Sequence, residues 1–122
     1  MRMPREIEFY RTQDGRCPVE EFLGALGPKE SQKVLWVLRL IGRIDRVPAN
    51  HFKKLVGTED IWECRISAQM GAYRLFGFFV RGNRLILTHG YSKKTQKTDS
   101  REITRAETYR QEYLNRHKEQ ES

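Results

Sequence analysis

The stretch that decides the fold is residues 61–97, which read IWECRISAQMGAYRLFGFFVRGNRLILTHGYSKKTQK. Apolar and polar side chains alternate over its first six residues, and residues 73–80 and 84–91 are dense in aromatic and branched side chains, as in β-strands. SAQMGA separates the first two segments, and Gly82-Asn83 suits a two-residue hairpin loop between the second and third. The sequence therefore predicts three strands in an antiparallel meander.

One strand and two helices are predicted before this stretch. A period of two over residues 5–11 predicts a half-buried first strand. Pro18 can then open a short helix, and apolar side chains at helical spacing predict a longer helix from about Lys29 to Ile44. These two helices are expected to form a helical hairpin.

A third helix is expected after the stretch. Asp99 can cap its start, with Glu102 three residues on as the partner in a capping box. The element order predicts one α+β domain over residues 1–122, with a polar tail from about Arg116. We expect an antiparallel or mixed sheet of about four strands, an N-terminal helical hairpin and a C-terminal helix.

Positive charge is concentrated in the same stretch. The 122 residues include 23 Lys and Arg against 16 Asp and Glu, a formal net charge of +7. Residues 61–97 hold seven basic residues and one acidic residue, so nearly all of the excess falls on three predicted strands and one loop. This arrangement favours an anionic partner on one face of the sheet, and nucleic acid over a membrane surface.

Several classes of protein do not fit the composition. There is no run of about 18 apolar residues, and the N-terminal MRMPREIEFYR lacks the apolar core of a secretory signal. Two cysteines are too few for a disulfide framework, the three histidines have no metal-ligand spacing, and there is no glycine-rich phosphate loop. We expect a cytoplasmic protein with no metal, no cofactor and no membrane partner.

Two arginines on the predicted strands are candidates for an anion site. Arg74 shares its strand face with aromatic side chains, where an unpaired guanidinium would cost several kcal/mol. It therefore either pairs with a carboxylate or lies at the strand end as a clamp for phosphate. Arg65 lies on the polar face of the preceding strand, and antiparallel pairing would bring it near Arg74 unless it is merely an exposed sheet residue.

Further basic residues could bind the same anion. Two interpretations of these residues remain open. The lysines could form a loop that only aids solubility, or they could form a basic surface with a tyrosine on which bases stack. The second would suit single-stranded nucleic acid. The residues concerned are Lys93, Lys94, Lys97 and Tyr91 at the end of the stretch, Lys53 and Lys54 in NHFKKL before it, and Arg84 on the third strand.

His89 is a candidate of a different kind. It alternates with Leu85, Leu87 and Tyr91, which would place it on an apolar face as a packed or hydrogen-bonded core residue. Its intrinsic pKa would equally suit a general acid or base.

This set of residue types suits one reaction in particular. In metal-free RNA cleavage the substrate's own 2′-OH attacks the adjacent phosphate. The protein then has to position the strand, neutralise charge on the phosphorane and move protons. Arginine and lysine can neutralise the charge, and histidine, tyrosine or a lysine of lowered pKa can move protons.

The motifs also resemble a known family. IWECRI, YRLFGFFVRGNRLILTHGYSKKTQKT and DSREITRAETYRQEYL are similar to the phage-derived HigB branch of the RelE/ParE toxin superfamily, over roughly residues 5–115. The KKTQKT loop is the most specific part, and Ile103 and Ala106 match the I-x-x-A pattern of the last helix. The resemblance implies a microbial-RNase-like fold and a type II toxin that cleaves mRNA in the ribosomal A site. It also implies a cognate antitoxin, often a helix-turn-helix protein of the HigA kind.

The resemblance also implies roles for single residues. Arg74 corresponds to a strand arginine that contacts the scissile phosphate, Arg65 to a basic residue on the preceding strand, and Lys93 with Lys94 to a basic pair. His89, Tyr91 and Lys97 would serve in proton transfer or base stacking. The chain departs from some relatives at Glu63, where they carry a second basic residue. Glu63 is then an acid or base, or an ion-pair partner of Arg74.

Two other functions remain open at this stage. The basic face could belong to a non-enzymatic nucleic-acid-binding regulatory module. The ParE side of the superfamily acts on gyrase, although the basic loop argues against that side.

Overall fold

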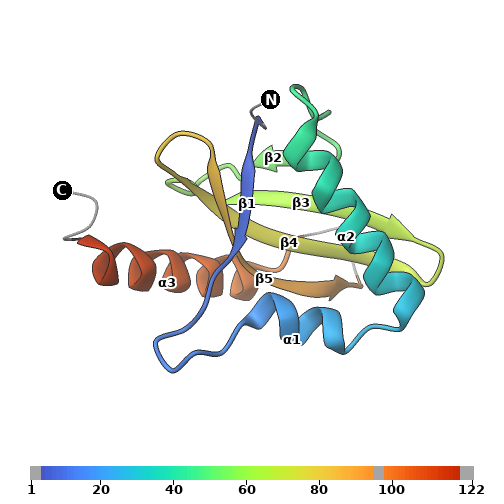
Figure 1. Ribbon diagram of the computed structural model, residues 1–122, viewed down its shortest axis with the longest axis horizontal. Helices are drawn as coiled ribbons and strands as arrows, with labels where there is room; N and C mark the ends of the chain where they lie inside the picture. Colours follow the sequence, from blue (N-terminus) through green and yellow to red (C-terminus); the bar gives the residue numbers. More distant parts are fainter. Residues whose placement is uncertain (1–3, 95–97, 119–122) are drawn as a thin grey trace.

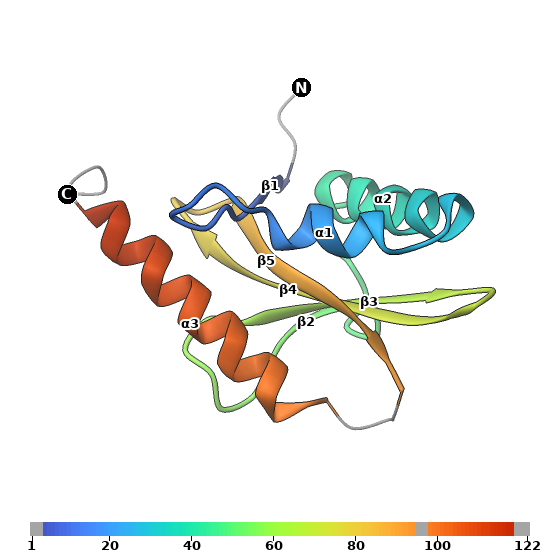
Figure 2. The same cartoon turned by 90° about the horizontal axis from the view of Figure 1, so that it is seen from below.

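The computed structural model describes residues 4–94 and 98–118. In chain order its elements are β1 (Glu6–Phe9), α1 (Pro18–Gly24), α2 (Pro28–Arg43), β2 (Phe52–Lys54), β3 (Trp62–Ala68), β4 (Gly71–Val80), β5 (Arg84–Lys93) and α3 (Ser100–Arg116). They form three layers, with α1 and α2 on one face of the sheet and α3 on the other (Figure 2). The predicted α+β class is confirmed.

The sheet has five strands in the order β1-β5-β4-β3-β2 (Figure 1). β1 pairs with β5 in parallel, and the other neighbours are antiparallel, so the sheet is mixed. The expected mixed sheet is confirmed, with five strands where about four were expected. The additional strand is β2, whose three residues are too few to show a period of two.

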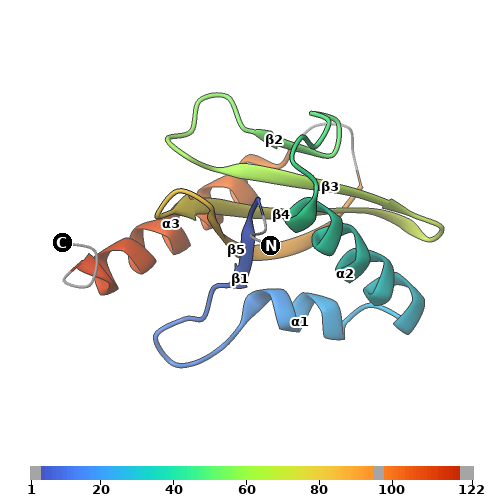
Figure 3. The same cartoon turned by 45° about the horizontal axis from the view of Figure 1, so that its top comes forward.

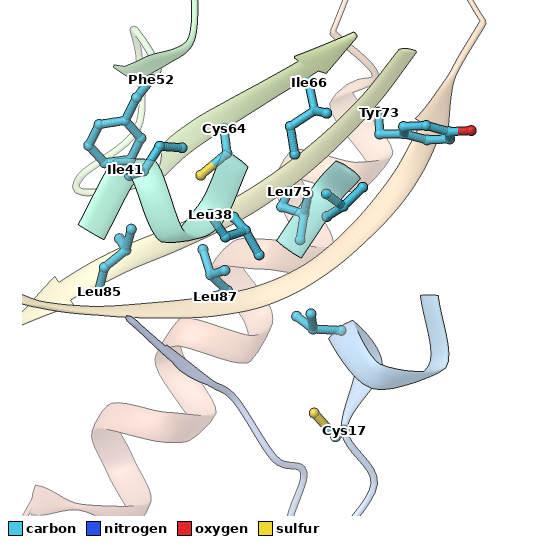
Figure 4. Close-up of a cluster of buried hydrophobic side chains, with 12 residues drawn as sticks. Cys17, Leu38, Ile41, Phe52, Cys64, Ile66, Tyr73, Leu75, Leu85 and Leu87 are labelled. Carbon is cyan, nitrogen blue, oxygen red and sulfur yellow. The ribbon is translucent and has the colours of Figure 1, made fainter. Parts of the chain in front are cut away.

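The larger core lies between the sheet and the two N-terminal helices. Alternation along β3 and β4 sends Cys64, Ile66 and Leu75 to this side, where they meet Leu38 and Ile41 of α2 (Figure 4). Burying such side chains stabilises the fold by about 1.5–3 kcal/mol each.

The opposite face of the sheet packs against α3. Phe78 of β4 packs edge-on against Tyr113 in a cluster that includes Val80, and Phe76 shares a second cluster with Ala106. The predicted helix start is confirmed, because the Asp99 side chain accepts a hydrogen bond from the backbone N–H of Arg101 at 2.9 Å.

A β-bulge in β5 changes which face its side chains occupy. Phe76 pairs with His89 but Gly77 pairs with Leu87, so Thr88 is the extra residue on β5. A Cβ on Gly77 would lie 2.8 Å from the backbone oxygen of Ile86, so only glycine permits the strands to approach this closely here.

The bulge overturns one expectation. Leu85 and Leu87 face the α1–α2 side, whereas His89 and Tyr91 face α3. They were predicted to share a face because a strict period of two was assumed, and the extra residue Thr88 reverses the alternation.

Two further local predictions are wrong. The positive φ angles in the β4–β5 turn fall on Arg81 (49°) and Gly82 (82°) and not on Gly82-Asn83, because three residues separate the paired Val80 and Arg84. Glu102 does not complete a capping box, because its carboxylate reaches His89 of β5 instead.

Candidate functional site

The strand register aligns two rows of side chains on the face of the sheet that α3 covers in part. One row runs from Arg65 through Arg74 to Tyr91, and the adjacent row places Glu63 opposite Phe76. Directly opposed residues in antiparallel strands have Cβ atoms about 4.5–5.5 Å apart. The register therefore brings both arginines and the tyrosine together, as expected for Arg65 and Arg74.

Glu63 lies between the two arginines. Its carboxylate is fully buried, with Oε1 3.3 Å from Arg65 Nε and Oε2 3.7 Å from Arg74 Nε. Thr98, in the segment before α3, donates a hydrogen bond to Oε2 at 3.2 Å. A buried carboxylate is tolerated only when it is paired in this way. Of the two expectations for Glu63, the ion pair with Arg74 is present.

The site holds more hydrogen-bond donors than it uses. Among the described residues, Arg65 Nε, Arg74 Nε, Lys93 Nζ and the Tyr91 hydroxyl are buried donors without a hydrogen-bond partner, and the acceptor Glu63 Oε1 also has none. Buried polar groups in folded proteins are normally paired, so four such groups beside one carboxylate mark an unusual place. Three cationic side chains against one anionic side chain leave an excess of positive charge, which suits an anion with several acceptor oxygens.

The directions in which the pKa values shift at this site agree with the excess of positive charge. Burial lowers the pKa of Lys93, and the positive charge of Arg74 lowers it further. The pKa of Arg74 is lowered by burial and, in part, by neighbouring Arg65. The pKa of Tyr91 is raised to about 12, mainly by burial and then by the charge of Glu63. A bound anion would relieve the unfavourable positive charge.

His89 lies one row further along the sheet. Its ring is 1% exposed, with Nδ1 3.0 Å from Thr88 Oγ1 and Nε2 3.0 Å from Glu102 Oε1. Burial and then the nearby Arg105 lower its pKa to about 4, so the ring is neutral at pH 7. It stacks on Tyr91 with ring centroids 6.4 Å apart. His89 thus supports the tyrosine from the interior of the protein.

The remaining candidates are not all in one place. Lys53 pairs with Glu63 and shares its face, whereas Lys54 alternates to the opposite face. Lys94 is exposed just beyond β5. Arg84 lies at the other end of β5, where its Nη2 donates to Glu8 at 3.0 Å. Lys97 lies outside the described residues.

The sequence did not predict the surroundings of two residues of the site. It did not predict that Glu63 would be buried between two arginines, nor that Thr98 would bind its carboxylate. One signal was present, since Glu63 is the single acidic residue in residues 61–97 and alternates onto the face of Arg65.

The described residues include no group of three or more His, Cys, Asp and Glu side chains placed to hold a metal ion. None of the helices in residues 4–94 and 98–118 is long and apolar enough to cross a membrane.

Fold and site together define a small α+β protein with a cluster of basic side chains, a candidate anion site, on one face of a mixed sheet. Residues 21–111 match the family model described as phage derived protein Gp49-like (DUF891), and the matched part includes Arg65, Arg74 and Lys93. The chain belongs to this Gp49-like family, which is part of the HigB/RelE-like toxin group and whose members typically pair with an antitoxin. No curated protein sequence matches the chain.

Proposed function

We propose that this protein is the toxin of a type II toxin–antitoxin system and a ribosome-dependent mRNA endoribonuclease. Cleavage through the substrate 2′-OH would inhibit translation and growth. The observation that supports this most is the convergence of Arg65, Arg74 and Lys93 around buried Glu63. Membership of the Gp49-like family is consistent with such a toxin.

In this proposal the scissile phosphate binds to the two arginines. A guanidinium offers parallel N–H donors that match two phosphate oxygens. Attack by the 2′-oxygen forms the new O–P bond, its proton passes to water, and negative charge develops on the non-bridging phosphate oxygens. Donors already fixed in place stabilise that charge without reorganising. Glu63 serves as the positioning residue, because its carboxylate lies within 4 Å of both Arg65 and Arg74.

Lys93 is the best placed of the three candidates for proton transfer. A lowered pKa makes its ammonium a better proton donor to the departing 5′-oxygen. The raised pKa of Tyr91 keeps its hydroxyl protonated, which suits hydrogen bonding or base stacking. His89 is buried and neutral, so we assign it a positioning role through its contact with Tyr91.

The exposed lysines would bind the flanking RNA. Lys53 lies on the same face as Glu63, and Lys94 follows β5 directly after Lys93. Both can neutralise phosphates next to the cleaved one. Lys97 would act in the same way.

Mapping mRNA ends after induction in a bacterial host tests the proposal. The wild-type protein should arrest growth and leave 2′,3′-cyclic phosphate ends within translated regions. Arg74→Ala should lose at least about a hundredfold of the cleavage, which is typical when one charge-stabilising donor is removed. Arg84→Ala is the matched control, because this arginine lies at the far end of β5.

Three results would contradict the proposal. Growth arrest without new mRNA ends, together with inhibited supercoiling in a purified assay, would indicate a gyrase inhibitor. Salt-sensitive RNA binding without any cleavage would indicate a non-enzymatic binding module. Full cleavage by the double variant Arg74→Ala, Lys94→Ala would show that the site is elsewhere.

A further inference from the structure

The outer edge of β3 is only partly covered. β2 pairs with β3 from Trp62 to Cys64, and the N–H of Arg65 then donates to the His51 oxygen at 2.8 Å. Figure 3 shows β3 continuing past β2. Because backbone groups along a strand point alternately to its two sides, the N–H and C=O of Ser67 face the same open side as the N–H of Arg65. No strand among the described residues pairs with Ser67 there.

A groove runs beside this edge, between β3 and α2. Its volume is about 330 Å³. Trp36, Ile44 and Ile66 are among the apolar side chains that line it. Trp36 is 51% exposed and Ile44 is 42% exposed, so two large apolar side chains border the groove in contact with solvent.

The charge around the groove has one sign. Lys33, His51 and Arg65 are its basic lining residues, and the described residues that line it include no carboxylate. Lys33 Nζ lies 5.2 Å from the centre of the Trp36 ring, so a cation sits directly over the largest exposed apolar side chain. An occupant with both apolar and acidic side chains would complement this surface.

We propose that an extended, acidic and apolar segment of a partner protein adds to β3 as a further strand at Ser67. Its backbone pairs with the open N–H and C=O of Ser67, as in β-strand addition. Side chains on one face of the added strand fill the groove against Trp36 and Ile44, and carboxylates on its other face approach Arg65, whose side chain lies on the α3 side of the sheet. The segment must be extended because its backbone pairs with an open strand edge. It must be acidic because the charged side chains that line the groove are basic.

Arg65 connects this docking surface to the anion site. It borders the groove, and its guanidinium lies on the α3 face of the sheet, with Nε 3.3 Å from Glu63 Oε1. A carboxylate of the docked segment that bonds to Arg65 competes with an RNA phosphate for the same guanidinium. This step rests on the proposed function, and it would let a partner weaken RNA binding without covering Arg74.

A synthetic peptide of about ten residues that alternates glutamate and valine is a suitable probe. It is titrated into the full chain without RNA, and binding is followed by calorimetry and by hydrogen exchange of single amides. We expect binding that slows exchange at Ser67 and weakens with added salt. A peptide alternating lysine and valine should not bind.

Ser67→Pro removes the donor at an edge position that tolerates proline and should weaken binding at least about tenfold, whereas Ser67→Ala should bind as wild type does. Trp36→Ala, at an exposed helix position, provides a second variant with the same expected loss should the proline variant not fold.

The inference is overturned if the acidic peptide does not bind, or if Ser67→Pro or Trp36→Ala leaves its affinity unchanged. Protection at β1 instead of Ser67, or a dimer of the chain that covers this edge, overturns it as well. The assay contains no RNA, so a chain that cleaves mRNA but fails to bind the peptide refutes this inference alone. A chain that binds the peptide but does not cleave refutes the proposed function alone.

Discussion

At the scale of single residues, Glu63 matters most to the arrangement of the site. Its carboxylate is fully buried and is the only negative charge within 4 Å of both Arg65 and Arg74 among the residues that the structure describes. Without it, two guanidinium groups would repel each other across adjacent strands. The acidic residue thus makes the basic site possible.

Replacing Glu63 with glutamine should cost about 3 kcal/mol of unfolding free energy, because it leaves two largely buried cations without a counter-charge. Urea denaturation measures this loss. Added sulfate should restore more stability in Glu63→Gln than in wild type, since the anion replaces the missing charge. The control is Glu8→Gln, which breaks a half-exposed pair with Arg84 and should cost at most about 1 kcal/mol. Equal losses in the two variants would contradict the central role of Glu63.

His89 predicts a pH dependence of stability. Its pKa falls from 6.5 to about 4 on folding, so between these values the unfolded chain binds the proton more readily than the folded chain. The stabilisation is complete above pH 6.5 and is lost as the pH falls towards 4, by about 3 kcal/mol. His89→Gln should flatten this part of the curve of unfolding free energy against pH. The prediction is refuted if the difference in unfolding free energy between wild type and His89→Gln stays constant from pH 6.5 to pH 4.

At the scale of elements, the bulge in β5 decides what the site contains. With a regular β5, Tyr91 and Lys93 would face α1 and α2 instead of joining Arg74. The extra residue Thr88 reverses the alternation after Leu87. One inserted residue therefore brings two functional candidates to the correct face.

Gly77 is the residue that admits this bulge, and Gly77→Ala should destabilise the protein by about 1–3 kcal/mol. Its Cβ would lie 2.8 Å from the Ile86 oxygen and 2.9 Å from Leu87 Cδ2, so the strands would have to move apart. Gly71→Ala on the same strand is the control, because its nearest contact would be an ordinary 3.7 Å. Denaturant unfolding compares the two, and equal stabilities would contradict the close approach.

At the scale of the whole molecule, the sheet has two differently used faces and an edge at β3 that β2 leaves partly open. The anion site lies on the α3 side, the apolar groove lies beside α2, and Arg65 belongs to both. In the proposed function, the net charge of +7 would attract RNA over a distance, and the paired and buried charges at the site would select one phosphate.

This arrangement predicts how RNA binding depends on salt. An oligoribonucleotide with 2′-deoxy substitutions cannot react, so its affinity can be measured directly. For single strands, a plot of log affinity against log salt concentration falls with a slope of about 0.7 for each phosphate that the protein neutralises. Arg74→Ala should therefore make this slope shallower by about 0.7. Arg84→Ala should leave it unchanged, because that arginine lies at the far end of β5. Equal slopes for wild type and Arg74→Ala would argue against phosphate binding by Arg74.

The sequence by itself determined the elements and part of the site. Periods of two and of 3.6 located the three long strands and all three helices, because each period reports which side of a single element is buried. Asp99 marked the start of the last helix through its own side chain. The closeness of Arg65 and Arg74 also followed locally, since one short hairpin joins their strands.

Only the tertiary structure decided the rest. The parallel pairing of β1 with β5, the short β2, the bulge at Thr88 and the burial of Glu63 all depend on segments far apart in the chain. Local propensity does not encode register or burial between distant strands, because packing of the whole sheet against its helices selects them. The sequence thus supplied the charges of the site, and long-range packing set which of them meet.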